Sequence, residues 1–149
     1  MMTTALFLIA MARAAAPGPF GVGVVLGSTT GASFGWRPTE QNGMQAAVGW
    51  DMGAGRFDGS VDYLQTVRVF APGAPLRVPV YVGLGAELAT EAPGLFGDAA
   101  GVWARVPIGA SLFLEEVPLE VFAQVVPRVR VLPVMTFGAD AAIGGRWYF

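Results

Sequence analysis

The sequence contains no histidine, no cysteine and no lysine, and only 13% of its 149 residues are charged. Without histidine and cysteine, the chain lacks the commonest metal ligands, the thiol nucleophile and the usual general base of enzymes. All nine basic residues are therefore arginines, and a formal net charge of −2 provides no basic surface for nucleic acid. These absences argue against metal, thiol and nucleic-acid chemistry.

A long hydrophobic run is missing as well. Hydrophobic residues make up 54% of the chain and the mean hydropathy is positive. After residue 16, however, Gly, Pro or a charged residue interrupts every long apolar stretch, whereas a membrane helix needs about 18 apolar residues in a row. An ordinary soluble domain, in turn, carries about 25% charged residues. Hydrophobicity spread thinly along the chain is typical of membrane β-barrels, in which alternate side chains face lipid.

The first sixteen residues have the pattern of an export leader. An apolar core from Ala5 to Ala12 is followed by Ala14-Ala15-Ala16, which fits the small-residue cleavage rule, and Pro17 comes next. The segment departs from the rule because no positive charge precedes the core and Arg13 lies late. We expect residues 1–16 to be a signal peptide and residues 17–149 to form one domain; the alternative is an N-terminal helix packed on that domain.

After Pro17, apolar and polar residues alternate with the period of two that is typical of β-strands. In residues 57–70, for example, Val61 and Tyr63 alternate with Ser60 and Asp62. Eight segments carry such a pattern: 20–27, 32–37, 43–52, 57–70, 78–88, 102–114, 118–131 and 137–149. An even number of strands separated by turns predicts an all-β fold, an antiparallel up-and-down eight-stranded transmembrane β-barrel.

Alternation alone does not say which face points inward. In a soluble barrel or sandwich, the apolar face would form the core. Two features favour the opposite arrangement. The less apolar face is rich in glycine, which makes room beside large side chains in a narrow lumen. The same face also carries balanced charges that suit paired, buried arginines and carboxylates: Arg37, Asp51, Asp58, Asp62, Arg68, Glu87, Arg105, Glu120, Arg128, Arg130, Asp140 and Arg146.

Several runs carry a resemblance to known proteins. The chain ends in Gly144-Gly145-Arg146-Trp147-Tyr148-Phe149, and it contains the glycine-rich run 21–27 and the runs 81–85 and 118–122. Together these resemble a family of small bacterial outer-membrane barrels with the general build of the OmpA and OmpX barrels. The resemblance implies a fold and a location over nearly all of residues 20–149, but no reaction. It also implies that Trp147, Tyr148 and Phe149 form the signal read by the barrel-insertion machinery.

If both termini lie in the periplasm, two aromatic girdles follow. One is expected at the periplasmic rim and the other at the outer rim. The expected members are Phe20, Trp36, Trp147 and Phe149 at the periplasmic rim, and Trp50, Phe57 and Phe137 at the outer rim. The alternative is that aromatic residues simply favour strands. Residues 89–100 then form the longest extracellular loop, because this stretch has Pro and Gly and no alternation.

The search for chemistry finds no catalytic, cofactor-binding or metal site. Outer-membrane enzymes that resemble serine hydrolases need a Ser–His pair, and histidine is missing. Asp58 and Asp62 are about 13 Å apart on one strand, too far for a carboxylate dyad. Glu115-Glu116 precedes Val117-Pro118 and indicates a turn.

We therefore predict a non-enzymatic outer-membrane protein with a structural or interaction role, partnered by lipid and by the insertion machinery, and monomeric. No cofactor, metal or nucleic-acid partner is expected. Two alternatives stay open: a narrow pore or small-ligand barrel, and a soluble periplasmic lipocalin-like binder.

Overall fold

The computed structural model describes residues 18–51, 56–73, 75–90, 100–114 and 116–149. The predicted leader, residues 1–16, lies outside this part of the chain. The strands are β1 (Phe20–Gly27), β2 (Thr30–Trp36), β3 (Asn42–Asp51), β4 (Arg56–Gly73), β5 (Leu76–Thr90), β6 (Ala100–Arg105), β7 (Ile108–Leu114), β8 (Leu119–Leu132) and β9 (Thr136–Tyr148). In the described residues, no helix is both long enough and apolar enough to cross a membrane.

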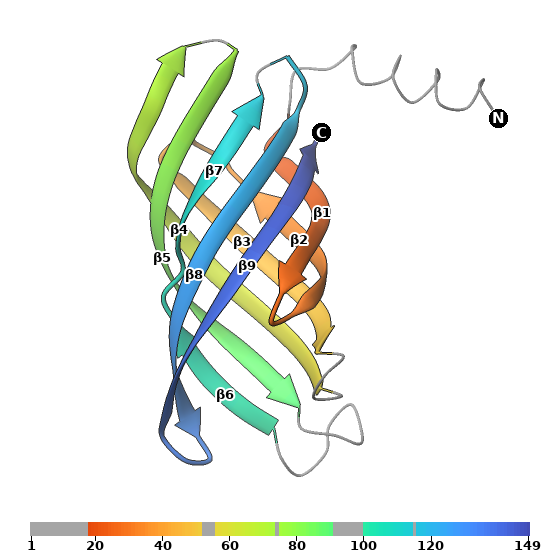
Figure 1. The fold of residues 1–149 in the computed structure, drawn as a ribbon, viewed down its shortest axis with the longest axis vertical. Helices are drawn as coiled ribbons and strands as arrows, with labels where there is room; N and C mark the ends of the chain where they lie inside the picture. The colour runs from red at the N-terminus through yellow and green to blue at the C-terminus, as the bar shows by residue number, and fades with distance from the viewer. Residues whose placement is uncertain (1–17, 52–55, 74, 91–99, 115) are drawn as a thin grey trace, which may run out of the picture.

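The strands close into an antiparallel ring (Figure 1). β1 pairs with β9 and β4 pairs with β5, so no gap is left between the first strand and the last. β6 and β7 occupy one position in the ring, because both pair with β5 on one side and β8 on the other. The ring therefore has eight positions, and the predicted eight-stranded up-and-down barrel is confirmed.

The segment 102–114 is two strands, where the alternation predicted one. The break falls at Val106 and Pro107, and proline has no N–H to contribute to a ladder. Neighbouring strands still use the backbone there: Gly83 N–H donates to the Pro107 carbonyl over 2.8 Å, and Val106 N–H donates to the Pro127 carbonyl over 2.9 Å.

The register around the ring tilts the strands. On one side, Val22 of β1 pairs directly with Trp147 of β9. On the other side, the paired residues can be followed from Val22 around the ring through β2, β3, β4, β5, β6 and β8, and this path reaches β9 at Phe137. The two positions on β9 are ten residues apart. Such a stagger makes strands run obliquely to the barrel axis (Figure 1). With this width and tilt, inward side chains fill the interior.

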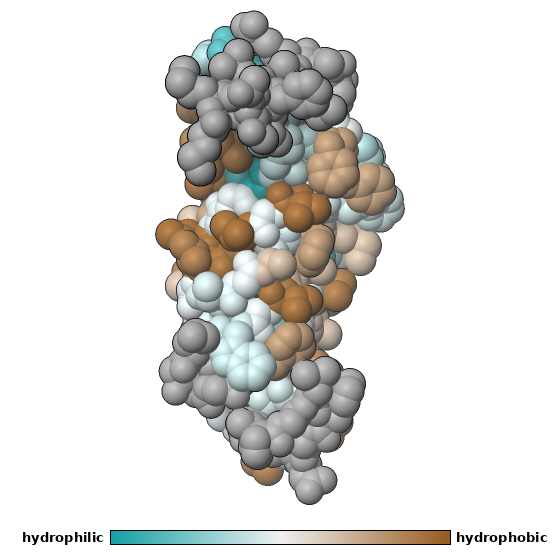
Figure 2. All heavy atoms as spheres, turned by 90° about the vertical axis from the view of Figure 1, so that its right-hand side faces the viewer, coloured by the Kyte–Doolittle hydropathy of each residue, from teal (hydrophilic) through white to brown (hydrophobic). Residues whose placement is uncertain are grey.

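Apolar side chains point outward over most of the barrel. Leu84 is 65% exposed, Val24 59% and Ile143 58%, whereas Asp62 is 1% exposed and Glu120 is fully buried. Figure 2 shows hydrophobic residues gathered across the middle of the face turned to the viewer. The soluble alternative needs the reverse orientation, with apolar side chains in the core.

A β-bulge in β4 reverses the faces near its end. The register shifts between Thr66 and Arg68, and an extra residue in one strand re-aims the side chains that follow it. Arg68 is consequently exposed, with its guanidinium carbon 5.1 Å from the ring centre of Phe70. The prediction that Arg68 joins a lumen network is therefore wrong, because strict alternation cannot register a bulge.

β1 begins and β9 ends at the same end of the barrel (Figure 1), which we call the terminal rim. Phe149 N–H donates to the Phe20 carbonyl over 2.9 Å, and the Phe20 and Trp36 rings stack at 6.4 Å. At the opposite end, the far rim, Trp50 and Phe57 meet edge to face at 6.2 Å. Two of the predicted aromatic residues therefore lie together at each end of the barrel.

The predicted loop 89–100 is shorter at both ends. β5 runs to Thr90 and β6 begins at Ala100, and Ala89 and Thr90 are both buried. Residues 91–99 lie outside the described part of the chain. The predicted turn after β7 is present at Glu116–Pro118, while Glu115 is not described.

Candidate functional site

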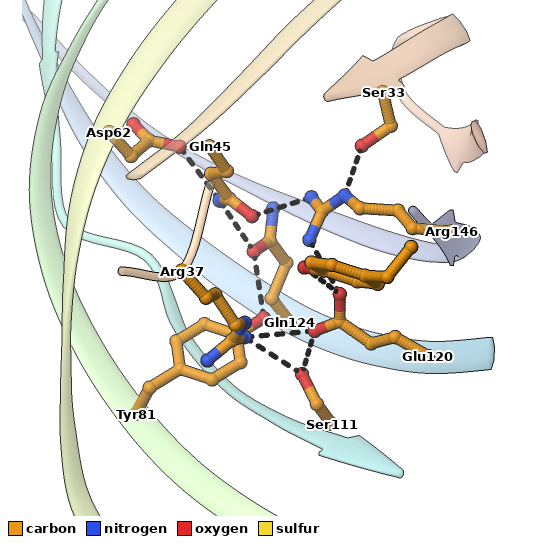
Figure 3. A network of polar contacts seen from close by, with 10 residues as sticks. Ser33, Arg37, Gln45, Asp62, Tyr81, Ser111, Glu120, Gln124 and Arg146 are labelled. Carbon is orange, nitrogen blue, oxygen red and sulfur yellow. Dashed lines mark hydrogen bonds and ion pairs between the residues drawn. The ribbon is translucent and has the colours of Figure 1, made fainter. Parts of the chain in front are cut away.

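Glu120 on β8 is the centre of a buried polar network in the lumen (Figure 3). It has no exposed surface, and one carboxylate oxygen accepts from Arg37 at 2.8 Å and from the Ser111 hydroxyl at 2.5 Å. The other oxygen accepts from the Tyr148 hydroxyl at 2.8 Å and from Arg146 at 3.2 Å. Four donors from three segments thus converge on one carboxylate, which offsets the cost of burying its charge.

Arg146 on β9 links this carboxylate to the opposite wall. Its Nε atom donates to Ser33 at 2.8 Å, and Nη2 donates to the side-chain oxygen of Gln45 at 2.8 Å. Its guanidinium carbon also lies 4.1 Å from the ring centre of Phe122. The planar fork of arginine suits such multiple contacts, because its donors point in fixed directions. β9 is thereby fastened to β2, β3 and β8 through the lumen.

Two glutamines continue the network between the walls (Figure 3). The Gln45 amide donates to Asp62 at 2.9 Å and to the Gln124 oxygen at 3.0 Å. The Tyr81 hydroxyl donates to the same Gln124 oxygen at 3.1 Å. All four side chains are buried, so these bonds cross a space from which bulk water is excluded.

A second cluster lies nearer the far rim. Arg105 contacts Asp62 at 3.0 Å through Nε and Glu87 at 2.9 Å through Nη1. Arg128 pairs with the other Glu87 oxygen and with Asp140 at 2.9 Å. Two arginines and three carboxylates thus form one connected group, and the predicted charge pairing inside the barrel exists for these residues.

Aromatic rings and glycines complete the packing of the lumen. The guanidinium carbons of Arg128 and Arg130 lie 4.3 and 4.9 Å from the ring centre of Trp103. A Cβ atom at Gly144 would come within 2.4 Å of the Phe122 ring, and one at Gly21 within 2.8 Å of the Tyr148 ring. These glycines therefore give large inward rings their space.

Three further predicted residues are Asp58, Asp51 and Arg37. Asp58 is 2% exposed and accepts from Thr29 at 2.8 Å. Asp51 ends β3, and its side chain is not among those described. Arg37 follows the last residue of β2 and turns back into the barrel. Burial lowers the pKa of Arg37, but the charge of Glu120 and contact with Tyr148 raise it more, so the pKa lies above its ordinary value.

Sequence reasoning missed the neutral members of the network and one arginine. Ser33, Gln45, Ser111 and Gln124 all occupy inward positions, as their burial shows. Arg56, whose Nε lies 3.2 Å from Asp58, was not singled out either. The signal was available in part, because the alternation that assigned the charges to one face also assigns these polar residues to it.

The polar side chains of the network fill and close the lumen more than they form a site for catalysis or metal binding. Each inward carboxylate described above accepts from arginine, a hydroxyl or an amide. Within the described ranges, no group of three or more acidic residues is placed to hold a metal ion. A cavity of about 30 Å³ near Asp58 and Glu87 is the size of a single water molecule. A larger cavity of about 520 Å³ opens at the terminal rim, beside Arg37 and Tyr148.

The fold and the lumen together define a small β-barrel with an apolar exterior and a charged, filled interior. Among solved structures, the chain is similar to the crystal structure of the N-terminal β-barrel domain of Pseudomonas aeruginosa OprF, with a TM-score of 0.52 and 18% sequence identity. The match covers 87% of this chain and 95% of that domain. At this identity the likeness establishes the fold, and the predicted build of a small OmpA- or OmpX-like barrel is confirmed.

No protein-family model matches the sequence, and no curated protein matches it either.

Proposed function

We propose that this protein is a non-enzymatic β-barrel of the bacterial outer membrane with a structural or interaction role in the cell envelope. One observation carries the proposal: the barrel has its apolar side chains outside and its charged side chains inside. In water, so much exposed apolar surface is unfavourable and promotes association. In a lipid bilayer the same surface is in its preferred medium, and a closed ring leaves no strand edge with unpaired backbone groups.

The two rims support this placement. Aromatic residues favour the interfaces of a bilayer, where the ring is partly in lipid and partly in the headgroup region. Phe20, Trp36 and Trp147 at the terminal rim are 54%, 40% and 40% exposed, and Trp50 at the far rim is 45% exposed. The exposed Arg68 is consistent with this arrangement, because β4 passes beyond its bulge there and a long basic side chain can reach the headgroups.

The filled lumen favours a structural role over an open pore. Side chains joined by hydrogen bonds cross it from β2 and β3 to β8 and β9, and an eight-stranded barrel leaves little space beyond its own side chains. We therefore expect no conductance above the bilayer background in planar membranes. A stable, reproducible single-channel current would favour the narrow-pore alternative.

Membrane fractionation with detergent extraction tests the location. The protein should sediment with outer membranes, resist extraction by high salt and be released by detergent. On gels it should also migrate differently with and without boiling, because a closed barrel stays folded in the detergent until it is heated. Recovery in the soluble periplasmic fraction, with one mobility, would contradict the proposal.

The leader and the assembly signal are part of the same proposal. We expect residues 1–16 to be removed during export, so the N-terminus of the exported protein should be Pro17. Deletion of Phe149 should reduce the amount of assembled barrel in cells while leaving synthesis unchanged, if the terminal aromatic is read by the insertion machinery. An exported protein that begins at Met1, or full assembly without Phe149, would contradict these two points respectively.

A further inference from the structure

The cavity of about 520 Å³ at the terminal rim has the features of a small-molecule site. We call it the vestibule. It exists because the β4–β5 hairpin continues past the bulge, which turns Val69 inward opposite Pro79. Its lining residues include Arg37, Glu40, Arg77, Phe113, Leu114 and Pro118. Below it, Arg37 and Tyr148 are both bonded to buried Glu120, so the closed network of the lumen forms its floor.

The vestibule combines apolar walls with two guanidinium groups. The guanidinium carbons of Arg37 and Arg77 lie 5.1 and 5.4 Å from the ring centre of Phe113. Their charges are not equally available. Arg37 is held by Glu120, which is fully buried. Arg77 pairs at 2.5 Å with Glu40, whose side chain is 79% exposed on the turn between β2 and β3. An exposed ion pair is worth little, so a competing anion can displace Glu40 at small cost.

Arg77 also has an unmet donor. Its Nε atom is buried and, within the described residues, has no hydrogen-bond partner, whereas Nη1 donates to Glu40. A buried donor without a partner is unfavourable and calls for an explanation. Nε shares one edge of the guanidinium with Nη2, whereas Glu40 is bound to Nη1. A carboxylate that lies against the Nε–Nη2 edge would satisfy Nε through a two-point contact of the kind arginine forms readily.

We propose that the vestibule binds a small monocarboxylate with an apolar body, whose carboxylate contacts the Nε–Nη2 edge of Arg77 and competes with Glu40 for the charge of that guanidinium. The apolar body would pack on Val69, Leu114 and Pro118. A monoanion fits because it exchanges one negative charge for another, while Arg37 stays neutralised by Glu120. A volume of about 520 Å³ lies within the range of ligand-binding cavities. The site depends on the fold and not on the membrane location, so it goes beyond the proposed function.

Isothermal titration calorimetry on the folded full barrel in phosphatidylcholine nanodiscs tests this proposal. The probe is 4-phenylbutyrate, and its neutral amide is the matched control ligand. We expect the carboxylate to bind at least about tenfold more tightly than the amide, because only the carboxylate can form the charged two-point contact. Equal affinity of the two compounds, or no binding of either, would overturn the proposal.

Three variants make the test specific to Arg77. Arg77→Gln should weaken binding about tenfold by removing the anchoring charge. Glu40→Gln should strengthen it by about threefold to fivefold, because it removes the competing carboxylate from an exposed pair. Arg68→Gln, with the same change of charge on the outer surface of β4, should leave the affinity within about twofold.

Glu40→Gln keeps the proposal open to refutation even if Arg77→Gln fails to fold, since Glu40 is exposed on a turn. Unchanged affinity in Glu40→Gln would show that the ligand does not compete for Arg77. Equal weakening by Arg77→Gln and Arg68→Gln would indicate a general charge effect, and it would overturn the assignment of this site.

Discussion

The Tyr148 hydroxyl donates a hydrogen bond of 2.8 Å to Oε2 of Glu120, and this bond joins the last strand of the barrel to the centre of its lumen. Tyr148 stands between Trp147 and Phe149, which are 40% and 65% exposed on the outer surface. The last three residues therefore face two environments, with Trp147 and Phe149 on the outer surface and Tyr148 in the lumen. The alternation along residues 147–149 sends two rings outward and one inward, where Gly21 leaves space for it.

Removal of that hydroxyl should destabilise the barrel. Tyr148→Phe leaves a buried carboxylate with one donor fewer, and hydrogen bonds to charged groups contribute about 1.5–3 kcal/mol. Urea unfolding in lipid vesicles measures the change. Tyr63→Phe is the matched control, because that hydroxyl bonds to Asn42 and Gln65 at the exposed surface. Equal losses in the two variants would show that the network adds nothing beyond an ordinary surface contact.

Lumen arginines should be far more sensitive than the exposed one. Arg105→Ala removes the cation shared by Asp62 and Glu87, which are 1% and 3% exposed. A broken buried pair costs about 3–5 kcal/mol. Arg68→Ala should change the free energy of unfolding by about 0.5 kcal/mol or less, since Arg68 lies on the surface. The same unfolding assay applies, and three near-neutral results for Arg105→Ala, Arg128→Ala and Arg146→Ala would contradict a dry, paired lumen.

Arginine on the outer wall distinguishes lipid from water around the barrel. Leu84 and Val121 are 65% and 46% exposed. If this wall faces hydrocarbon, Leu84→Arg and Val121→Arg should each cost about 2–4 kcal/mol near the bilayer midplane. In water, a charged residue at an exposed site would be close to neutral. Folding free energies in vesicles provide the measurement, with Phe137→Arg at the far rim as a control that should cost less.

Glycine at position 144 should be required for packing inside the barrel. A Cβ atom there would lie 2.4 Å from Cζ of Phe122 and 2.5 Å from the backbone oxygen of Val24. Gly144→Ala should therefore destabilise the barrel by about 1–3 kcal/mol through overpacking. At Gly59 a Cβ atom meets nothing within 4 Å, so Gly59→Ala should be neutral or stabilising by up to about 1 kcal/mol. Indistinguishable unfolding curves would show that the lumen has room to adjust.

Much of the fold was predictable because strand alternation is a local property. In β8, polar Glu120 and Gln124 point inward while Val121 and Val125 point outward, as the period of two requires. The same rule places Asp58, Asp62, Glu87 and Arg146 inside. It fails at the bulge beside Val67 and at Pro107, because each changes the register between strands, and register depends on partners that are distant in sequence.

The sequence by itself determined that this chain forms amphipathic strands with one apolar and one polar face, because each residue's face follows from its position along its own strand. It also determined that the polar face carries no histidine, cysteine or lysine. Tertiary structure alone decided which charges meet. Arg146 reaches Ser33, 113 positions away, and Arg37 reaches Glu120, 83 positions away. Those contacts depend on closure and stagger of the whole ring, which no single segment encodes.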